Sequence, residues 1–366
     1  MTTNTVVFIS DIPNPREFKF ASGLKEIGWN VILMHRSPAI FSNFQPFSKV
    51  LPFTSINDLI PKILEISPEI LHVFIYYDYS FAYHLINTFK TIPVIIDPFD
   101  VIYGMFKHEF FIKNPLLTAN SELEKYCFSN ADGICCRCLQ TQVYRREIGF
   151  NKNKRILFFD GCLPGIKKNK VIVTNNNDVH LVYAGAFCAE KLFPEFKGFG
   201  GFLWVAKKII EANMHFHLYP SSRNFNVTNF ADDYSEYYEL EKNSNGKFHF
   251  HRPIPYENLI SELSQYDAGI YVSFPEKTEN IDEVIYCERS QKSANYVIPN
   301  KIFDSLEAGL PVIADPVHHK CIMPYLKKLK VFISPDELIY SEKPSFDLEK
   351  LNIANQHIAE AAEYFN

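Results

Sequence analysis

The hydrophobic positions of this chain fall into short runs separated by longer segments with helical spacing. The runs are rich in β-branched and aromatic residues, and the segments between them repeat apolar residues on one helical face. This alternation is typical of βαβ units that build a parallel sheet. The pattern therefore predicts an α/β protein.

In the first half of the chain, the predicted strands are 6–10, 31–35, 70–76, 93–97, 133–136 and 155–159. A helix fits between the first two strands, because Phe18, Ala21, Leu24 and Ile27 recur at helical spacing. Gly28 follows them, where a helix C-terminal cap belongs.

The second half repeats this order of elements. Its predicted strands are 180–184, 215–219, 247–251, 268–273, 311–314 and 330–333. Its predicted helices are 202–212, 256–265 and 300–309, and residues 346–365 have the pattern of one or two more. The repeat predicts two similar domains.

A chain of 366 residues exceeds the size at which a single hydrophobic core stops growing. We predict two doubly wound, Rossmann-like domains at 1–165 and 175–345, joined through a polar stretch. Residues 346–366 form a helical segment that could return to the first domain. Two such sheets facing each other leave a cleft at the carboxyl ends of their strands, where such folds bind ligands.

The overall charge is slightly negative. The formal net charge is -5, so no global positive field attracts nucleic acid, and we expect no nucleic-acid partner. Hydrophobic residues make up 47% of the chain and charged residues 22%, which favours a folded protein over a disordered one.

The N-terminus passes from polar residues directly into an apolar run, without a basic region or a small-residue cleavage site. This pattern predicts no signal peptide and a cytoplasmic location. No apolar stretch is long enough to span a bilayer. Basic residues near the predicted junction could still contact the inner face of an anionic membrane, although such runs are usually solvated. They are Lys152, Lys154, Arg155, Lys167, Lys168 and Lys170.

The eight cysteines do not indicate a disulfide framework in a chain of this length. Cys135 and Cys138 have the spacing of one arm of a zinc site, but no second arm follows, so we expect no metal site. The sequence also contains no Asp-x-Asp, a pair of carboxylates that often binds a divalent metal ion.

The most informative stretch is 299–315. Its pattern is a short helix that opens after Pro299, ends at Gly309 and leads into a buried strand. The first helical turn, at Asn300 and Lys301, would offer backbone N–H groups and an ammonium to a phosphate. Asp304, one turn along, could reach ribose hydroxyls.

This stretch resembles the donor-binding motif of the family 4-like glycosyltransferases, which have the GT-B architecture. In that family an acidic helix runs into a small-Gly-x-Pro-Val pattern, and Asp304 falls where the second glutamate of a Glu-x7-Glu pair holds the donor ribose. The first glutamate would fall at Tyr296, so the pattern departs there. The Lys-hydrophobic-aromatic-acid form of some branches matches residues 301–304 more closely. The resemblance covers nearly the whole chain and is strongest from 178 to 316.

Further matches occur in the order that the family has. Gly185 follows the strand 180–184 and would let the backbone approach the donor phosphates. The nearest basic residue after it is Lys191, further along than the family usually has it. Arg223 could clamp a diphosphate or be an ordinary solvated arginine. The resemblance makes Ile254 and Pro255 candidates for contacts with the nucleotide base.

In the first domain, acidic and imidazole side chains lie at or after predicted strand ends. His72, Asp78, Asp97 and Asp100 could orient an acceptor hydroxyl, and His72, Asp97 and Asp100 are the catalytic candidates. For His72 the sequence favours a buried core position over a catalytic one.

The resemblance implies a glycosyltransferase that needs a nucleotide-diphosphate sugar as co-substrate and no further cofactor, with retention of anomeric configuration. The acceptor could be a glycan, a lipid-linked sugar or a protein. Two alternatives stay open, a nucleotide-sugar 2-epimerase and a non-catalytic nucleotide-sugar-binding partner subunit. The second is motivated by Tyr296 in place of glutamate and by the missing basic residue after Gly185.

Overall fold

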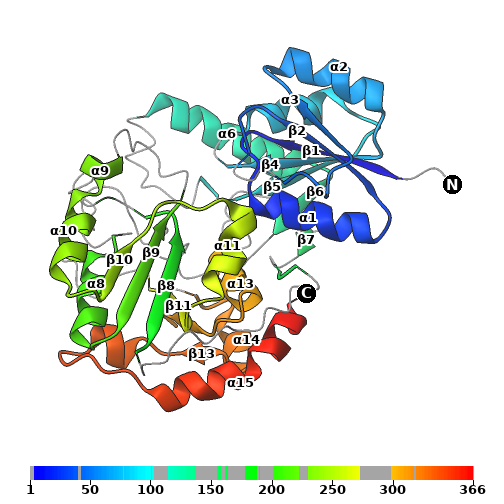
Figure 1. Cartoon of the computed structure of the whole chain (residues 1–366). Coiled ribbons are helices and arrows are strands. Elements are labelled where there is room, and N and C mark those ends of the chain that lie inside the picture. The colour runs from blue at the N-terminus through cyan, green and yellow to red at the C-terminus, as the bar shows by residue number, and fades with distance from the viewer. Residues whose placement is uncertain are drawn as a thin grey trace. The chain divides into compact units, whose positions relative to one another are not determined.

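The computed structural model describes residues 4–39, 43–76, 78–99, 101–102, 114–136, 155–157, 161–163, 178–187, 189, 201–221, 230–272, 298–316 and 319–365. These residues divide into two compact units, each built on one sheet (Figure 1). The described residues of unit 1 lie within 1–160, and those of unit 2 within 161–281 and 298–366.

Unit 1 contains a seven-stranded sheet with the order β3-β2-β1-β4-β5-β6-β7. All neighbouring strands in it are parallel. The strands are β1 (Thr5–Ser10), β2 (Asn30–His35), β3 (Lys49–Pro52), β4 (Ile70–Ile75), β5 (Val94–Pro98), β6 (Gly133–Cys136) and β7 (Arg155–Leu157). The strand order changes direction between β1 and β4, which makes the carboxyl ends of these two strands the switch point of the sheet.

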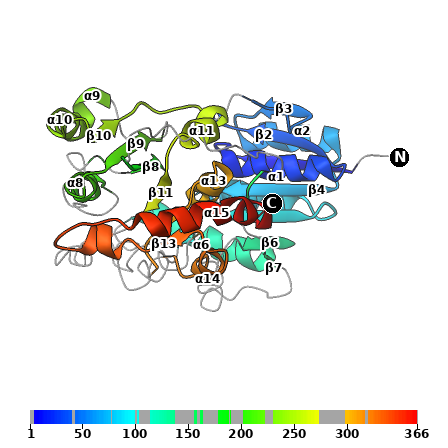
Figure 2. The ribbon, with the colours of Figure 1, turned by 60° about the horizontal axis from the view of Figure 1, so that its bottom comes forward.

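Helices cover both faces of this sheet. They are α1 (Pro15–Glu26), α2 (Ile56–Ile66), α3 (Ser80–Thr88) and α6 (Pro115–Asn130). The last three pack on one face, where Leu59, Leu85 and Phe128 join the strand residues in a buried apolar core. Helix α1 lies on the other face, where Phe20 contacts the rings of His72 and Phe74 (Figure 2).

The ends of α1 follow from its local sequence. Asn14 is the N-cap, and it forms a capping box with Glu17, while Pro15 occupies the first turn. At the other end Gly28 has a φ of 87°, which is the left-handed conformation that glycine adopts most easily. The predicted C-terminal cap at Gly28 is therefore confirmed.

Unit 2 contains a six-stranded parallel sheet with the order β10-β9-β8-β11-β12-β13. Its strands are β8 (His180–Gly185), β9 (His215–Pro220), β10 (Phe248–Phe250), β11 (Ala268–Tyr271), β12 (Val312–Ala314) and β13 (Phe332–Ile333). Here the switch point lies between β8 and β11.

The helical elements of unit 2 are α8 (Leu203–Glu211), α9 (Phe230–Asp233), α10 (Ser235–Asn243), α11 (Tyr256–Leu263), α13 (Asn300–Glu307), α14 (Met323–Lys328), the π-helix η4 (Asp336–Tyr340) and α15 (Leu348–Tyr364). Helices α8 and α10 pack on the face that carries Phe216 and Phe248. Helix α11 packs on the opposite face, against Val182, Ala184 and Tyr219.

The last described residues return to the start of unit 2. Helix α15 packs on α13 and β13, and the ring of Phe365 contacts that of Phe303 in an edge arrangement. The N–H of Cys162 donates to the carbonyl oxygen of Phe365 at 3.0 Å, and a Cβ at Gly161 would collide with the same oxygen. The segment from 346 is thus a single helix of unit 2, and its predicted return to the first domain stays a prediction.

The predicted parallel α/β architecture is confirmed. Each predicted strand is present within a few residues, and the described part of 155–159 is β7. Strand β3 was not predicted, because its four residues are only half-buried or exposed and carry no strong apolar pattern.

Candidate functional site

The switch point of unit 2 brings the start of α13 against the turn that follows β8. Lys301, in the first turn of α13, donates a hydrogen bond from Nζ to the phenol oxygen of Tyr183. The carbonyl oxygen of Ala186 lies 3.5 Å from the same nitrogen. Residues 115 to 118 positions apart in sequence therefore meet at the edge of the sheet where parallel sheets bind ligands.

Gly185 makes this approach possible. Its φ is 151°, and a Cβ at this position would collide with the Cε and Nζ atoms of Lys301. Any larger residue would force the Lys301 side chain away from the turn. The close contact that Gly185 permits here is with Lys301, and its predicted approach to the donor phosphates stays a prediction.

Tyr183 holds both partners in place. Its hydroxyl donates to the carbonyl oxygen of Ala186 at 2.6 Å, and its ring centroid lies 4.5 Å from Nζ of Lys301. The ring itself packs on Phe202 at 4.0 Å between centroids. One side chain therefore orients both the turn and the ammonium.

The environment of Lys301 changes its protonation. Burial lowers the pKa of the ammonium to about 8, and the negative charge of Asp304 acts in the opposite direction. The group remains a cation at neutral pH and is incompletely solvated. A desolvated cation beside a helix N-terminus attracts an anion strongly.

Helix α13 is held tightly against β11. The hydroxyls of Tyr271 and Ser305 share a hydrogen bond of 2.5 Å, and Gly269 leaves the space that Ser305 fills, because a Cβ there would collide with its Oγ. Asp304 lies on the same helix and is 7% exposed. Its predicted contact with a ribose stays a prediction.

In unit 1 a charged group of side chains lies at the switch point of the sheet. Asp11 follows β1, Arg36 follows β2 and Asp78 follows β4. Nε of Arg36 lies 2.6 Å from Oδ1 of Asp11, and its Nη2 lies 3.7 Å from Oδ2 of Asp78. The hydrogen bond that Arg36 donates to Asp11 raises the pKa of the guanidinium. The carboxylates are 27% and 42% exposed, so both are accessible to solvent.

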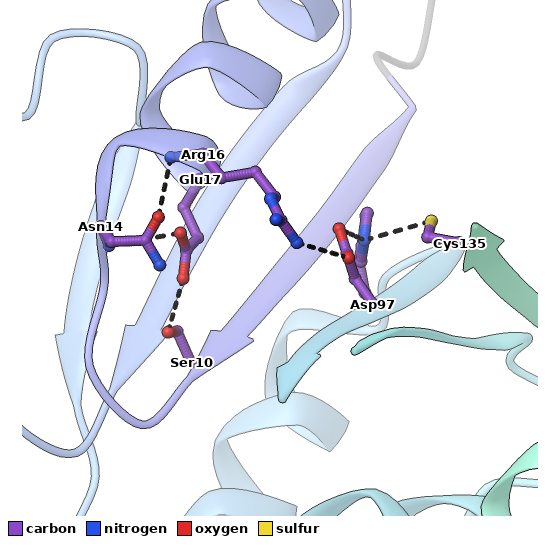
Figure 3. Close-up of polar contacts among 7 residues, drawn as sticks. Ser10, Asn14, Arg16, Glu17, Asp97 and Cys135 are labelled. Atoms are coloured by element: carbon purple, nitrogen blue, oxygen red, sulfur yellow. Dashed lines mark hydrogen bonds and ion pairs between the residues drawn. The ribbon is translucent and has the colours of Figure 1, made fainter. Parts of the chain in front are cut away.

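A second charged group of unit 1 is buried beneath the start of α1 (Figure 3). Nη1 of Arg16 donates to Oδ1 of Asp97 at 2.9 Å, and both side chains are fully buried. Nε2 of His72 lies 3.5 Å from the other oxygen of Asp97, and the guanidinium lies 3.7 Å above the centre of the Phe99 ring. We call Arg16, Glu17, His72 and Asp97 the buried charge cluster.

Glu17 completes this cluster from the first turn of α1. The hydroxyl of Ser10 donates to Oε1 at 2.7 Å, and the backbone N–H of Asn14 donates to Oε2 at 3.2 Å. Burial raises the pKa of the Glu17 carboxyl to about 7, although these hydrogen bonds and Arg16 oppose the shift. Glu17 therefore titrates close to neutral pH.

No protein family matches the sequence, and no curated protein sequence matches it. Solved structures do match the whole chain. The chain is similar to HepE of Anabaena in complex with UDP and glucose, with 12% identity and a TM-score of 0.64, covering 99% of this chain and 96% of that one.

Two further matches are synthases with different products. Sucrose-phosphate synthase of Thermosynechococcus elongatus is 13% identical with a TM-score of 0.59, covering 99% of this chain and 91% of that chain. The α,α-trehalose 6-phosphate synthase of Burkholderia multivorans is 8% identical with a TM-score of 0.61, covering 100% and 94%. Both halves of the chain thus match two-domain glycosyltransferase structures. The fold is GT-B.

The sequence-predicted residues have different places in this GT-B chain. Lys301 lies against Gly185 at the switch point of unit 2, and Asn300 and Asp304 belong to the same helix as Lys301. Ile254 packs beside α11 on an apolar cluster that includes Val182 and Tyr219. Asp100, Lys191 and Arg223 lie outside the described residues.

His72 does not lie at a strand end, where a catalytic role would place it. His72 lies inside β4, is 6% exposed, and stacks on Phe74 at 4.3 Å between ring centroids. Asp97 is 0% exposed and is ion-paired with Arg16. Both have the environment of buried structural residues, and their catalytic roles stay predictions.

Arg36 and Asp11 were missed by the sequence reasoning. Both immediately follow strands whose carboxyl ends lie beside the switch point of the GT-B domain. That position was the available signal, since polar residues directly after adjacent parallel strands meet at one edge of the sheet.

Among the described residues, one group has metal-ligand spacing: His72, Asp97 and Cys135, whose ligand atoms lie within 4.8 Å of one another. Arg16 already pairs with Asp97, and this cation opposes a second positive charge in the same buried space. None of the helices in the described ranges is long and apolar enough to cross a membrane.

Proposed function

We propose that this chain is a glycosyltransferase that takes a sugar from a nucleotide-diphosphate donor bound by unit 2. The observation that carries the proposal is the ammonium of Lys301, fixed by Tyr183 between the Gly185 turn and the first turn of α13. A diphosphate needs this combination of a cation, exposed backbone and a helix N-terminus. The similarity to HepE, whose structure contains UDP and glucose, supports the donor class.

The transfer proceeds without a bound metal ion. The sequence contains no Asp-x-Asp motif, so the leaving diphosphate is stabilised by Lys301 and by backbone N–H groups at the start of α13. Each well-placed donor of this kind contributes about 3 kcal/mol of transition-state stabilisation. Asp304 binds the ribose of the donor.

The reaction retains the anomeric configuration, as the resemblance to the family 4-like enzymes implies. The bond between the anomeric carbon and the phosphate oxygen breaks, and the bond to the acceptor oxygen forms on the same face. The acceptor proton passes to the leaving phosphate, so the protein need not supply a base.

The acceptor binds to unit 1 at the switch point of its sheet. The exposed carboxylates of Asp11 and Asp78 can accept hydrogen bonds from sugar hydroxyls, and Arg36 holds them at fixed positions. The acceptor is a glycan, a lipid-linked sugar or a protein, and a peripheral contact with an anionic membrane would suit the second of these.

The test is a thermal-shift screen against UDP-, GDP-, CMP- and dTDP-linked sugars, with and without EDTA. It compares the wild type with Lys301→Ala, Asp304→Asn and the control Lys320→Ala, whose lysine is exposed. We expect one nucleotide class to raise the Tm of wild type and control, with and without EDTA, and Lys301→Ala to weaken binding about 10- to 100-fold.

A response of Lys301→Ala equal to that of the wild type would refute the donor site. Release of free nucleotide in the presence of acceptor distinguishes a transferase from a binding subunit. A new sugar nucleotide without acceptor would instead indicate an epimerase.

A further inference from the structure

Five of the 12 histidines of the chain gather on one face of the unit 2 sheet, on the edge strand and the two strands next to it. We call them the histidine cluster. They are His180 on β8, His215 and His217 on β9, and His249 and His251 on or directly after β10.

The rings of this cluster stack where parallel strands place residues opposite each other. His180 is paired with His215 in the register, and His217 with His249. The stacked pairs are His180 with His215 at 4.2 Å, His217 with His249 at 4.2 Å and Tyr219 with His251 at 4.1 Å between ring centroids.

Hydrogen bonds join the cluster diagonally, from one stacked pair to the next. Nδ1 of His180 lies 2.9 Å from Nε2 of His217, and Nδ1 of His217 lies 3.0 Å from Nε2 of His251. Nδ1 of His215 lies 3.1 Å from Nε2 of His249. A neutral imidazole has one donor nitrogen and one acceptor nitrogen, so neutral rings satisfy each of these contacts.

Lys247 determines the tautomer of one pair. Its ammonium donates to Nε2 of His215 at 3.2 Å, so the proton of His215 is on Nδ1 and is donated to Nε2 of His249. A further proton on His215 would face the ammonium directly. The carboxylate of Asp178 lies 3.4 Å from Lys247 and 3.7 Å from His215, and partly balances this charge.

The other charged groups around the cluster are already engaged. Asp267 accepts the backbone N–H of His180 at 2.8 Å, and Glu241 of α10 accepts that of Phe250 at 2.8 Å. The carboxylates and cation that face the cluster from the packed elements are Asp178, Glu241, Glu262, Asp267 and Lys247.

Burial and the neighbouring imidazoles oppose protonation throughout the cluster. Burial lowers the pKa of His215 and His251 to about 4, and lowers the pKa of His217 further still. The pKa values of His180 and His249 are also lowered, again mainly by burial.

Helix α11 and the short segment after it are attached to this cluster. The Tyr219 hydroxyl lies 2.5 Å from Oε1 of Glu262 in α11 and 2.5 Å from the hydroxyl of Tyr266. The ring of Tyr266 lies 4.4 Å from that of His217. Stacking and hydrogen bonding thus run continuously from β10 through β9 to α11.

We propose that the histidine cluster is an acid-sensitive clamp, which holds β9, β10 and α11 together while its imidazoles are neutral and releases them when it takes up protons. This inference is independent of the proposed glycosyltransferase activity. A histidine in an opened segment has a pKa of about 6.5. Between that value and about 4 the opened state binds more protons, so acidification favours opening. Each such histidine raises the opening constant about tenfold per pH unit.

The test compares the full chain with the double variant His215→Gln, His251→Gln and with the control His357→Gln on α15. We measure the unfolding equilibrium constant of unit 2 from about pH 7.5 to about pH 5. In this range the histidines take up protons in the opened state, while those of the folded cluster stay neutral. In the wild type and the control the constant should rise steeply below pH 6.5. The double variant lacks two of the titrating histidines. Its unfolding constant should therefore rise about a hundredfold less per pH unit than that of the wild type.

Hydrogen exchange of the wild type provides an independent measurement if the variant does not fold. Protection factors of β9, β10 and α11 should fall on acidification, while those of β11 and β12 fall less. Equal pH dependence of wild type and double variant, or unchanged protection in β9 and β10, would overturn the proposal.

Discussion

The buried charge cluster of unit 1 and the histidine cluster of unit 2 shield polar side chains from water in different electrostatic forms. Unit 1 buries a pair of full charges, Arg16 and Asp97. The histidine cluster consists of neutral imidazoles, half-buried except for the buried His217, which satisfy one another through ring nitrogens. Full charges require a partner of opposite sign, whereas neutral rings require only matched donors and acceptors. The first arrangement is sensitive to loss of one partner, and the second is sensitive to gain of a proton.

The two units also respond to pH in opposite directions. The pKa of Glu17 is raised from 4.5 to about 7 on folding, so its contribution is fully present below pH 4.5 and is lost as pH rises through 7. The histidine pKa values are lowered from 6.5 to about 4 at His215 and His251, so stability is lost as pH falls through this window. Acidification therefore strengthens unit 1 while it weakens unit 2.

The largest effect should come from removing one charge of the unit 1 pair. Asp97→Asn leaves the guanidinium of Arg16 buried beside a neutral amide, and breaking a buried pair in this way costs about 3–5 kcal/mol. Urea unfolding measures the loss. The exposed Glu122, paired with Lys125 on α6, offers the matched acid-to-amide control, and Glu122→Gln should cost less than about 0.5 kcal/mol. Similar losses for both variants would show that Asp97 is effectively solvated.

The titration of Glu17 should change stability less than the loss of Asp97 does. Its pH dependence should be opposite in sign to that of the histidine cluster. A shift from 4.5 to about 7 corresponds to about 3 kcal/mol of added stability as pH falls across this range. The wild type should gain this amount relative to Glu17→Gln, which cannot titrate. Unfolding of both proteins at several pH values measures the difference. Glu65→Gln, at an exposed site on α2, should follow the wild type throughout.

The smallest effect should come from a single neutral pair of unit 2. His249→Gln at neutral pH exchanges one imidazole hydrogen bond for an amide at a half-buried position, and such a bond contributes about 1 kcal/mol. Denaturant unfolding near pH 7.5 measures the loss, with His357→Gln as the control. A loss as large as that of Asp97→Asn would mean that the cluster carries charge at neutral pH, and the contrast between the units would fail.

Much of the fold could be predicted from local pattern, since buried parallel strands are continuous apolar runs. The strand that was missed, β3, lies at the edge of its sheet and buries little. Edge strands carry a weak pattern because only part of their surface faces the core. The capping box at the start of α1 is formed by Asn14 and Glu17, which the local sequence can indicate. The burial of these residues depends on tertiary packing, which the local sequence does not contain.

The candidate site was predictable only where local pattern and sheet position agree. Gly185 and Lys301 follow from a glycine after a strand and a helix N-terminus at the same edge. His72 has the buried core environment that its position inside the predicted strand 70–76 favours, and its catalytic role stays a prediction. The histidine cluster had a signal in the His-x-His spacing of 215–217 and 249–251, which places both rings of each pair on one face of a strand. The pairing between strands could not be read from spacing alone.

The hydrogen bond between Cys162 and Phe365 joins the start of the described part of unit 2 to its last described residue. Two points of a chain that lie at neighbouring atoms can be connected by a short linker, and the chain can then be opened at another surface loop. Residues 162 and 365 are therefore close enough for such a connection. The tight contact at Gly161 sets the condition, because a linker there must begin with a residue that needs no Cβ.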